Sequence, residues 1–186
     1  MNKTIRVCSM DASTNSLAFA IFEDKKLIRS GKINFVGNTT YEKIGDAFAK
    51  VRAFFKSCAV DSVVIEHTVF MNSPRTAADL ALIQGAILSA MWQSGISEIG
   101  SVSPITWQSY IGNKKLTKEE KLVVKNQNPS KSLSWLKAYE RNIRKERTIK
   151  YVNINYDMKI SDNDVADAIA IGHWAINNWE KAVNYE

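Results

Sequence analysis

The stretch Val63-Val64-Ile65-Glu66 is a short apolar run that ends in a carboxylate. A run of β-branched residues of this length is typical of a buried strand, with Glu66 at the end of that strand. An unpaired carboxylate is costly to bury, so its charge must be balanced by an Arg or Lys, a proton or a metal ion. The sequence therefore predicts a polar site where this strand ends.

Around this run the sequence predicts an α/β fold with a five-stranded mixed sheet. Its strands are expected at residues 5–11, 17–22, 27–35, 63–66 and 99–102. Short polar connections join the first three, which indicates an antiparallel meander. A helix with a capping box at Thr39 and Glu42 would then lead back, so that the fourth strand lies parallel to the first. Asp11, at the end of the first strand, would lie beside Glu66.

Further carboxylates open a helical run near the end of the sequence. Asp164 and Asp167 are three residues apart, so both project from one face of the first turn. Asp162 is expected to cap this helix or favour its positive end, although it competes with Asp164 as a metal ligand. A purely local interpretation, in which these acids serve only the helix start, leaves Asp11 and Glu66 unexplained.

Together the acids predict a divalent metal site. Carboxylates held close together repel one another unless a cation lies between them, and hard oxygen ligands favour Mg²⁺ or Mn²⁺. The residues predicted to be both catalytic and metal-binding are Asp11, Glu66, Asp164 and Asp167. Such sites often hold two ions, which activate a water and stabilise the leaving oxygen of a phosphodiester. A zinc site is not expected, because His67 and His173 are the only histidines and the cysteines form no cluster.

The positive charge is concentrated in one segment. Residues 114–150 carry 12 Lys and Arg against 4 Glu, whereas the rest of the chain has 13 basic against 15 acidic residues. Helices are expected near 118–125 and 133–147, and the stretch 151–156 fits either a strand or a linker. The segment is interpreted as a polyanion-binding arm or, alternatively, as a solvated charged insertion.

The helix expected from Pro74 to Trp92 is apolar on nearly every face. Such a helix needs cover on all sides, and the sheet can supply only one of them. This favours a homodimer through this helix, with a buried helix inside a monomer as the alternative.

The chain of 186 residues, 45% of them hydrophobic, suits one domain over 1–186 with a basic helical insertion at about 113–150. No apolar run is long enough to span a bilayer, and the N-terminus does not resemble a signal peptide. Cys8 and Cys58 are expected to be free thiols in a reducing compartment. The expected location is the cytoplasm, or the host cytoplasm for a viral protein.

The order of elements and acids resembles the RNase H-like nuclease superfamily, and within it the RuvC-type Holliday junction resolvases. The segments that carry the resemblance are 10–15 (MDASTN), 64–72 (VIEHTVFMN), 102–104 (VSP) and 164–170 (DVADAIA). The resemblance implies a five-stranded mixed sheet flanked by helices and a homodimer that binds four-way DNA junctions. It also implies paired nicking of opposed strands with Mg²⁺, which leaves 5′-phosphate and 3′-hydroxyl ends.

On this resemblance the four acids match the acidic ligands of the family, and Phe70 corresponds to an aromatic residue inserted at the junction core. Phe70 lies one residue further from the glutamate than the family pattern, and the insertion at 113–150 is longer and more basic than its equivalent. From charge, the residues expected to bind the DNA backbone are Lys114, Lys115, Lys118, Lys121, Arg141, Arg144, Lys145 and Arg147.

Two alternative functions stay open from the sequence. Asp11-Ala12-Ser13-Thr14 after a first strand is similar to the phosphate loop of sugar kinases and actin-type ATPases. Those proteins need two such domains and a glycine-rich adenosine loop, which the sequence lacks. The other alternative is a non-catalytic nucleic-acid-binding module with the same fold, against which the complete set of acids argues.

Overall fold

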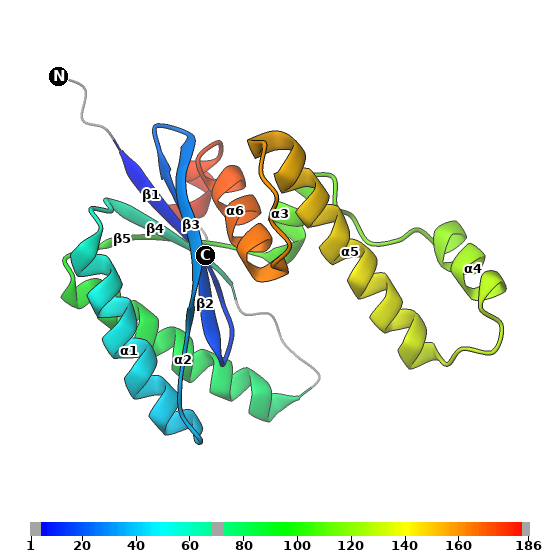
Figure 1. Ribbon diagram of the computed structural model, residues 1–186, viewed down its shortest axis with the longest axis horizontal. Coiled ribbons are helices and arrows are strands. Elements are labelled where there is room, and N and C mark those ends of the chain that lie inside the picture. The colour runs from blue at the N-terminus through cyan, green and yellow to red at the C-terminus, as the bar shows by residue number, and fades with distance from the viewer. Residues whose placement is uncertain (1–4, 68–72, 184–186) are drawn as a thin grey trace.

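The computed structural model describes residues 5–67 and 73–183 (Figure 1). Its sheet has five strands in the order β3-β2-β1-β4-β5. The strands are β1 (Arg6–Ala12), β2 (Ser16–Glu23), β3 (Lys26–Asn34), β4 (Ser62–Glu66) and β5 (Glu98–Val102). β2 is antiparallel to β1 and to β3, whereas β4 is parallel to both β1 and β5. The predicted mixed sheet, with its first three strands antiparallel, is confirmed.

Helices cover both faces of this sheet (Figure 1). They are α1 (Thr40–Ser57), α2 (Pro74–Gln93), α3 (Pro104–Tyr110), α4 (Lys118–Gln127), α5 (Leu133–Tyr156), α6 (Asn163–Ala175) and α7 (Trp179–Val183). α1 and α2 share one core with the sheet, and α6 shares the other with α3 and the end of α5. In the described ranges, no helix is both long enough and apolar enough to cross a membrane.

Strand alternation decides which side chains face α6. Met10 and Ile65 belong to the core under α1 and α2, and they pair with each other in the parallel ladder of β1 and β4. Because successive side chains on a strand point to opposite faces, the next residues, Asp11 and Glu66, turn to the α6 side. Two acids that are 55 positions apart in the sequence thus lie on the same face of the sheet, at the carboxyl ends of two adjacent parallel strands.

Gly172 lets α6 approach the sheet closely. A Cβ atom at this position would lie 2.1 Å from Cε2 of Phe22 and 2.5 Å from Oγ of Ser9. The buried hydroxyl of Ser9 donates to the carbonyl oxygen of Ala168 at 2.6 Å, which ties the helix directly to β1. This contact brings the first turn of α6 to the strand ends that carry Asp11.

α4 and the first half of α5 form a hairpin that extends away from the sheet (Figure 1). α4 has no buried residue, and ion pairs hold it to α5: Lys121 with Glu140 at 3.2 Å and Arg147 with Glu120 at 3.3 Å. The prediction of a strand or linker at 151–156 is wrong, because α5 continues through these residues to a left-handed cap at Asp157.

Candidate active site

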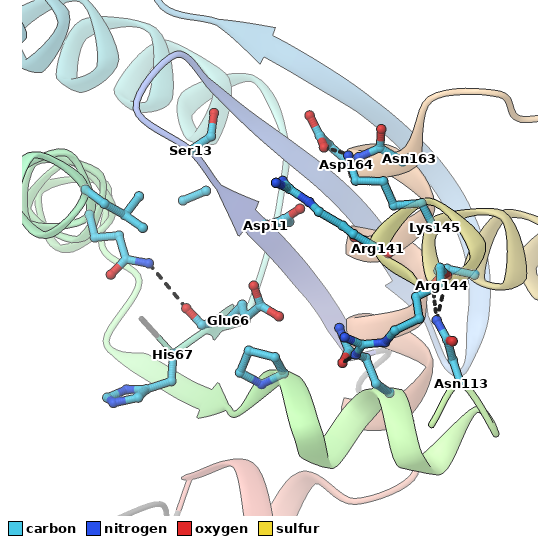
Figure 2. Close-up of a pocket in the computed structure, with 17 residues that line it drawn as sticks. Asp11, Ser13, Glu66, His67, Asn113, Arg141, Arg144, Lys145, Asn163 and Asp164 are labelled. Carbon is cyan, nitrogen blue, oxygen red and sulfur yellow. Dashed lines mark hydrogen bonds between the residues drawn. The ribbon is translucent and has the colours of Figure 1, made fainter. Parts of the chain in front are cut away.

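All four predicted acids line a single pocket of about 410 Å³ (Figure 2). Asp11 comes from β1, Glu66 from β4, and Asp164 and Asp167 from the first turns of α6. Opposite them, α5 contributes Arg141, Arg144, Lys145 and Thr148. The pocket therefore joins an acidic floor, built by the sheet and α6, to a basic wall built by α5.

Burial makes Asp11 and Glu66 hard to ionise, and at Asp11 the neighbouring negative charges add to this effect. The pKa of Asp11 is raised well above its usual range by burial first, and then by the negative charges of Glu66, Asp167 and Asp164. Burial likewise raises the pKa of Glu66, while a hydrogen bond from Nε1 of Trp107 to Oε1, at 2.7 Å, acts in the opposite direction. A cation placed among these groups would relieve both the burial cost and the repulsion.

Asp167 has a pKa of about 7. Burial is the largest cause, and repulsion from Glu66 and then from Asp164 adds to it, while a hydrogen bond with Thr148 and the charge of Lys145 oppose it. The pocket thus contains a carboxylic acid that exchanges its proton close to neutral pH.

Asp164 and Asp162 have different roles at the start of α6. Oδ1 of Asp162 accepts hydrogen bonds from the backbone N–H groups of Asp164 and Val165, at 2.9 and 3.2 Å, so Asp162 is the expected N-cap. Asp164 is the one that lines the pocket. Its two oxygens accept hydrogen bonds from Nδ2 of Asn163 and, at 2.5 Å, from Nζ of Lys32.

The chemistry of the donor set fits a hard divalent cation, because oxygen ligands surround the pocket and their charges repel one another. The side chains are nevertheless engaged elsewhere: Glu66 with Trp107, and Asp164 with Lys32. Over the described parts of the chain, no three His, Cys, Asp or Glu side chains form a group that could hold a metal ion as they stand. A metal ion would therefore have to replace Lys32 at Asp164 and bind Glu66 through its other oxygen, while Trp107 keeps its hydrogen bond to Oε1.

The basic residues expected to bind DNA fall into separate groups. Arg141, Arg144 and Lys145 line the acidic pocket, and Figure 2 shows them extending from α5. Arg141 and Lys145 also line an adjoining hollow of about 500 Å³ further along α5, together with Lys137. The remaining residues lie outside the pocket: Lys114 and Lys115 are exposed, Lys118 and Lys121 border an apolar groove between α4 and α5, and Arg147 pairs with Glu120. Phe70 lies outside the described residues.

Sequence reasoning missed several side chains that support the site. Trp107 is buried, and its indole also reaches Glu66. Asn113 is buried and donates from Nδ2 to Oγ1 of Thr148 at 2.9 Å, which places the hydroxyl that meets Asp167. A buried Asn just after Gly112 is the signal that could have drawn attention to this link.

The two histidines lie in different surroundings. His67 is exposed and lines the pocket beside Glu66. His173 forms hydrogen bonds with the hydroxyls of Tyr151 and Tyr156, at 2.9 and 2.8 Å, and so fastens the end of α5 to α6. Burial lowers the pKa of His173.

No protein-family model and no curated protein sequence matches the chain. Solved structures do match. RuvC from Thermus thermophilus, in complex with a Holliday junction substrate, has a TM-score of 0.66 at 15% identity, over 94% of this chain and 96% of that one. The yeast mitochondrial Holliday junction resolvase Ydc2 has a TM-score of 0.51 at 13% identity, over 98% of this chain and 82% of that one. The chain therefore has the RNase H-like fold that is found in RuvC.

Proposed function

We propose that the protein is a divalent-metal-dependent endonuclease that resolves four-way DNA junctions by paired nicking. The observation that carries this proposal is the pocket in which acids from β1, β4 and α6 face basic side chains from α5. A phosphodiester needs both: carboxylates to hold cations at the reacting phosphate, and fixed positive charge to bind the backbone. The proposal treats residues 1–186 as one nuclease domain with a DNA-binding insertion at about 113–150.

Asp11, Glu66, Asp164 and Asp167 are the residues that would hold the metal. Mg²⁺, or Mn²⁺ in its place, would lower the pKa of an attacking water and stabilise charge on the phosphate and the leaving 3′ oxygen; two ions per site are proposed. Hydrolysis would then leave a 5′-phosphate and a 3′-hydroxyl. Asp167, with its pKa of about 7, must lose its proton before it can act as a ligand.

The basic side chains would place the scissile strand over the acids. Arg141 and Lys145 line both the acidic pocket and the adjoining hollow, so they can contact successive phosphates as a strand leaves the site. Arg144 donates to Oε1 of Gln108 and lies beside Asn113, which fixes it against α3. Phosphate contacts of this kind position the duplex and carry no sequence preference.

A homodimer through α2 would supply the second nick. Leu82 and Trp92 are 50% and 60% exposed on this helix, and small residues lie between them. A two-fold dimer places two equivalent sites on a substrate that is itself nearly two-fold symmetric, which suits symmetric cutting.

The experiment that tests the proposal is a nicking assay on labelled four-way junction, flap and plain duplex DNA with and without Mg²⁺. We expect paired nicks on the junction only with metal, and loss of cutting with retained junction binding in Asp11→Asn and Glu66→Gln. Retained cleavage in either variant removes that residue from the site. Junction binding without cleavage under any metal condition would favour the non-catalytic module, and a thermal shift with ATP but not with DNA would favour the kinase alternative.

A further inference from the structure

A lysine lies against the acidic pocket from the side of β3. Nζ of Lys32 donates to Oδ2 of Asp164 at 2.5 Å and to Oδ2 of Asp162 at 3.2 Å. The side chains of Lys32 and Asp164 are only 26% and 34% exposed, so this pair is partly shielded from water. Lys32 therefore occupies an oxygen that a metal ion would also seek.

The strand register explains how a β3 residue reaches this place. Lys32 pairs with Ala18 of β2, and Ala18 pairs with Asp11 of β1, so the three residues form one row across the sheet. Directly paired residues share a face, which puts Lys32 on the α6 side together with Asp11. The residue between them is a fully buried alanine, whose small side chain leaves space for the lysine stem beside the start of α6.

The charge of Lys32 acts on more than its direct partners. It lowers the pKa of Asp11, against the larger effects of burial and of the neighbouring carboxylates. In return, although partial burial works in the other direction, the hydrogen bonds that Lys32 donates to Asp164 and Asp162 raise the pKa of Lys32. In the absence of metal, Lys32 is thus a permanent positive charge next to the acids.

We propose that Lys32 is the internal counter-ion of the metal-free site, which gives up Asp164 to a divalent cation and stays paired with Asp162. The inference rests on the proposed metal-dependent function. Asp162 is suited to keep the lysine, because its Oδ1 is fixed by the backbone N–H groups at the start of α6 while its Oδ2 faces Lys32. Lys32 is then a positioning residue that sets metal affinity, because lysine and metal compete for one carboxylate.

The test measures Mn²⁺ binding by electron paramagnetic resonance without DNA, together with melting temperature. We expect Lys32→Met to bind Mn²⁺ about tenfold more tightly, since a unit charge beside the ion is gone. Without metal its melting temperature should fall by about 2–5 °C, and the difference should vanish at saturating Mn²⁺. Lys32→Arg should keep the wild-type affinity, and Lys32→Gln should behave as Lys32→Met does.

Lys50→Met is the matched control, because Lys50 forms an ion pair with Asp46 at 2.7 Å within α1, across the sheet from α6. It removes the same charge and should leave Mn²⁺ affinity unchanged. If Lys32→Met and Lys32→Gln bind Mn²⁺ no more tightly than the wild type does, Lys32 is not a competitor, although the metal site stands. If the wild-type protein and every variant bind no Mn²⁺, both this inference and the proposed function fail.

Discussion

Nε1 of Trp107 donates a hydrogen bond to Oε1 of Glu66 at 2.7 Å, and the tryptophan itself is 1% exposed. The first helix after β5 thus holds the carboxylate at the end of β4 in a fixed orientation. The bond also favours the charged form of Glu66, which burial disfavours. Trp107 therefore contributes both to the core and to the readiness of Glu66 for a cation.

Replacing Trp107 by Phe should raise the pKa of Glu66 further, because the hydrogen bond that opposes burial is lost. Metal binding would then need a higher pH, and the midpoint of its pH profile should move upward. We also expect a loss of about 1–3 kcal/mol in the free energy of unfolding, as for a buried acceptor left without its donor. Mn²⁺ titrations across pH and urea unfolding measure the two effects.

Trp174→Phe is the control for Trp107→Phe, because Trp174 is equally a core residue, 4% exposed, on α6. It should reduce stability without moving the pH midpoint of metal binding. Equal midpoints in both variants would mean that the indole of Trp107 does not tune Glu66.

The metal-free protein should lose stability as the pH rises. The pKa of Asp167 is about 7 in the folded protein against an ordinary 3.8. The stability that protonated Asp167 contributes to the folded state is therefore fully present below about pH 4 and is lost as the pH rises toward 7. Between about pH 5 and pH 7 the loss from this group is at most about 3 kcal/mol, at roughly 1.4 kcal/mol per pKa unit. Asp167→Asn should flatten the dependence, which thermal unfolding in chelator measures.

Addition of Mg²⁺ at high pH should restore the stability of the wild-type protein, because a bound cation replaces the lost proton. It should do less for Asp167→Asn, which lacks a charged ligand at this position. A variant that shows the wild-type slope from about pH 5 to pH 7 would mean that Asp167 is not the titrating group.

The convergence of the four acids could be anticipated from the sequence, because strand alternation and the parallel pairing of two predicted strands together fix where their last side chains lie. Once β1 and β4 are parallel, Asp11 and Glu66 must meet, and the spacing of Asp164 and Asp167 puts both on one face of α6. The contact of Lys32 with Asp164 could not be predicted in this way. It depends on the exact register of β3 against β2 and on how far α6 reaches over the sheet, neither of which a single sequence reveals.

The same limit applies to the support of the site. The burial of Trp107 could be read from an apolar helix face, but the partner of its indole N–H depends on where α3 lies against β4. The continuation of α5 through 151–156 was missed because alternating residues there also fit a strand. In the structure these residues are helical, and Val152 is buried in the core that α6 shares.

Arg141→Ala and Lys145→Ala should each weaken junction binding and reduce its salt dependence. For each phosphate that the protein no longer neutralises, the slope of log K against log salt becomes shallower by about 0.9. Lys56→Ala, an exposed residue of α1 on the other side of the sheet, is the charge-matched control and should leave the slope unchanged. Fluorescence anisotropy at several salt concentrations distinguishes these outcomes; equal slopes in all three variants would argue against the basic wall as the DNA-binding surface.

Leu82→Glu and Trp92→Glu should convert a dimer to monomers, because each places a charge on the exposed apolar face of α2. Sedimentation should then give the mass of one chain, against twice that mass for the wild type, and paired nicking should become single nicking. Tyr41→Glu is the control, since Tyr41 is 81% exposed on α1. A wild-type protein that sediments as a monomer at all concentrations would exclude α2 as a dimer interface.

Gly172→Ala should destabilise the protein by about 3 kcal/mol or more, since its methyl group would lie 2.1 Å from Cε2 of Phe22. The clash must push α6 away from β1, and this would also separate Asp167 from Asp11 and weaken Mn²⁺ binding. Gly45→Ala offers the opposite case, because a Cβ there meets nothing within 4 Å on α1. It should stabilise the protein by about 0.5–1 kcal/mol. Urea unfolding of both variants, with Mn²⁺ titration of the folded protein, tests whether close packing at Gly172 sets the geometry of the acids; wild-type stability in Gly172→Ala would show that it does not.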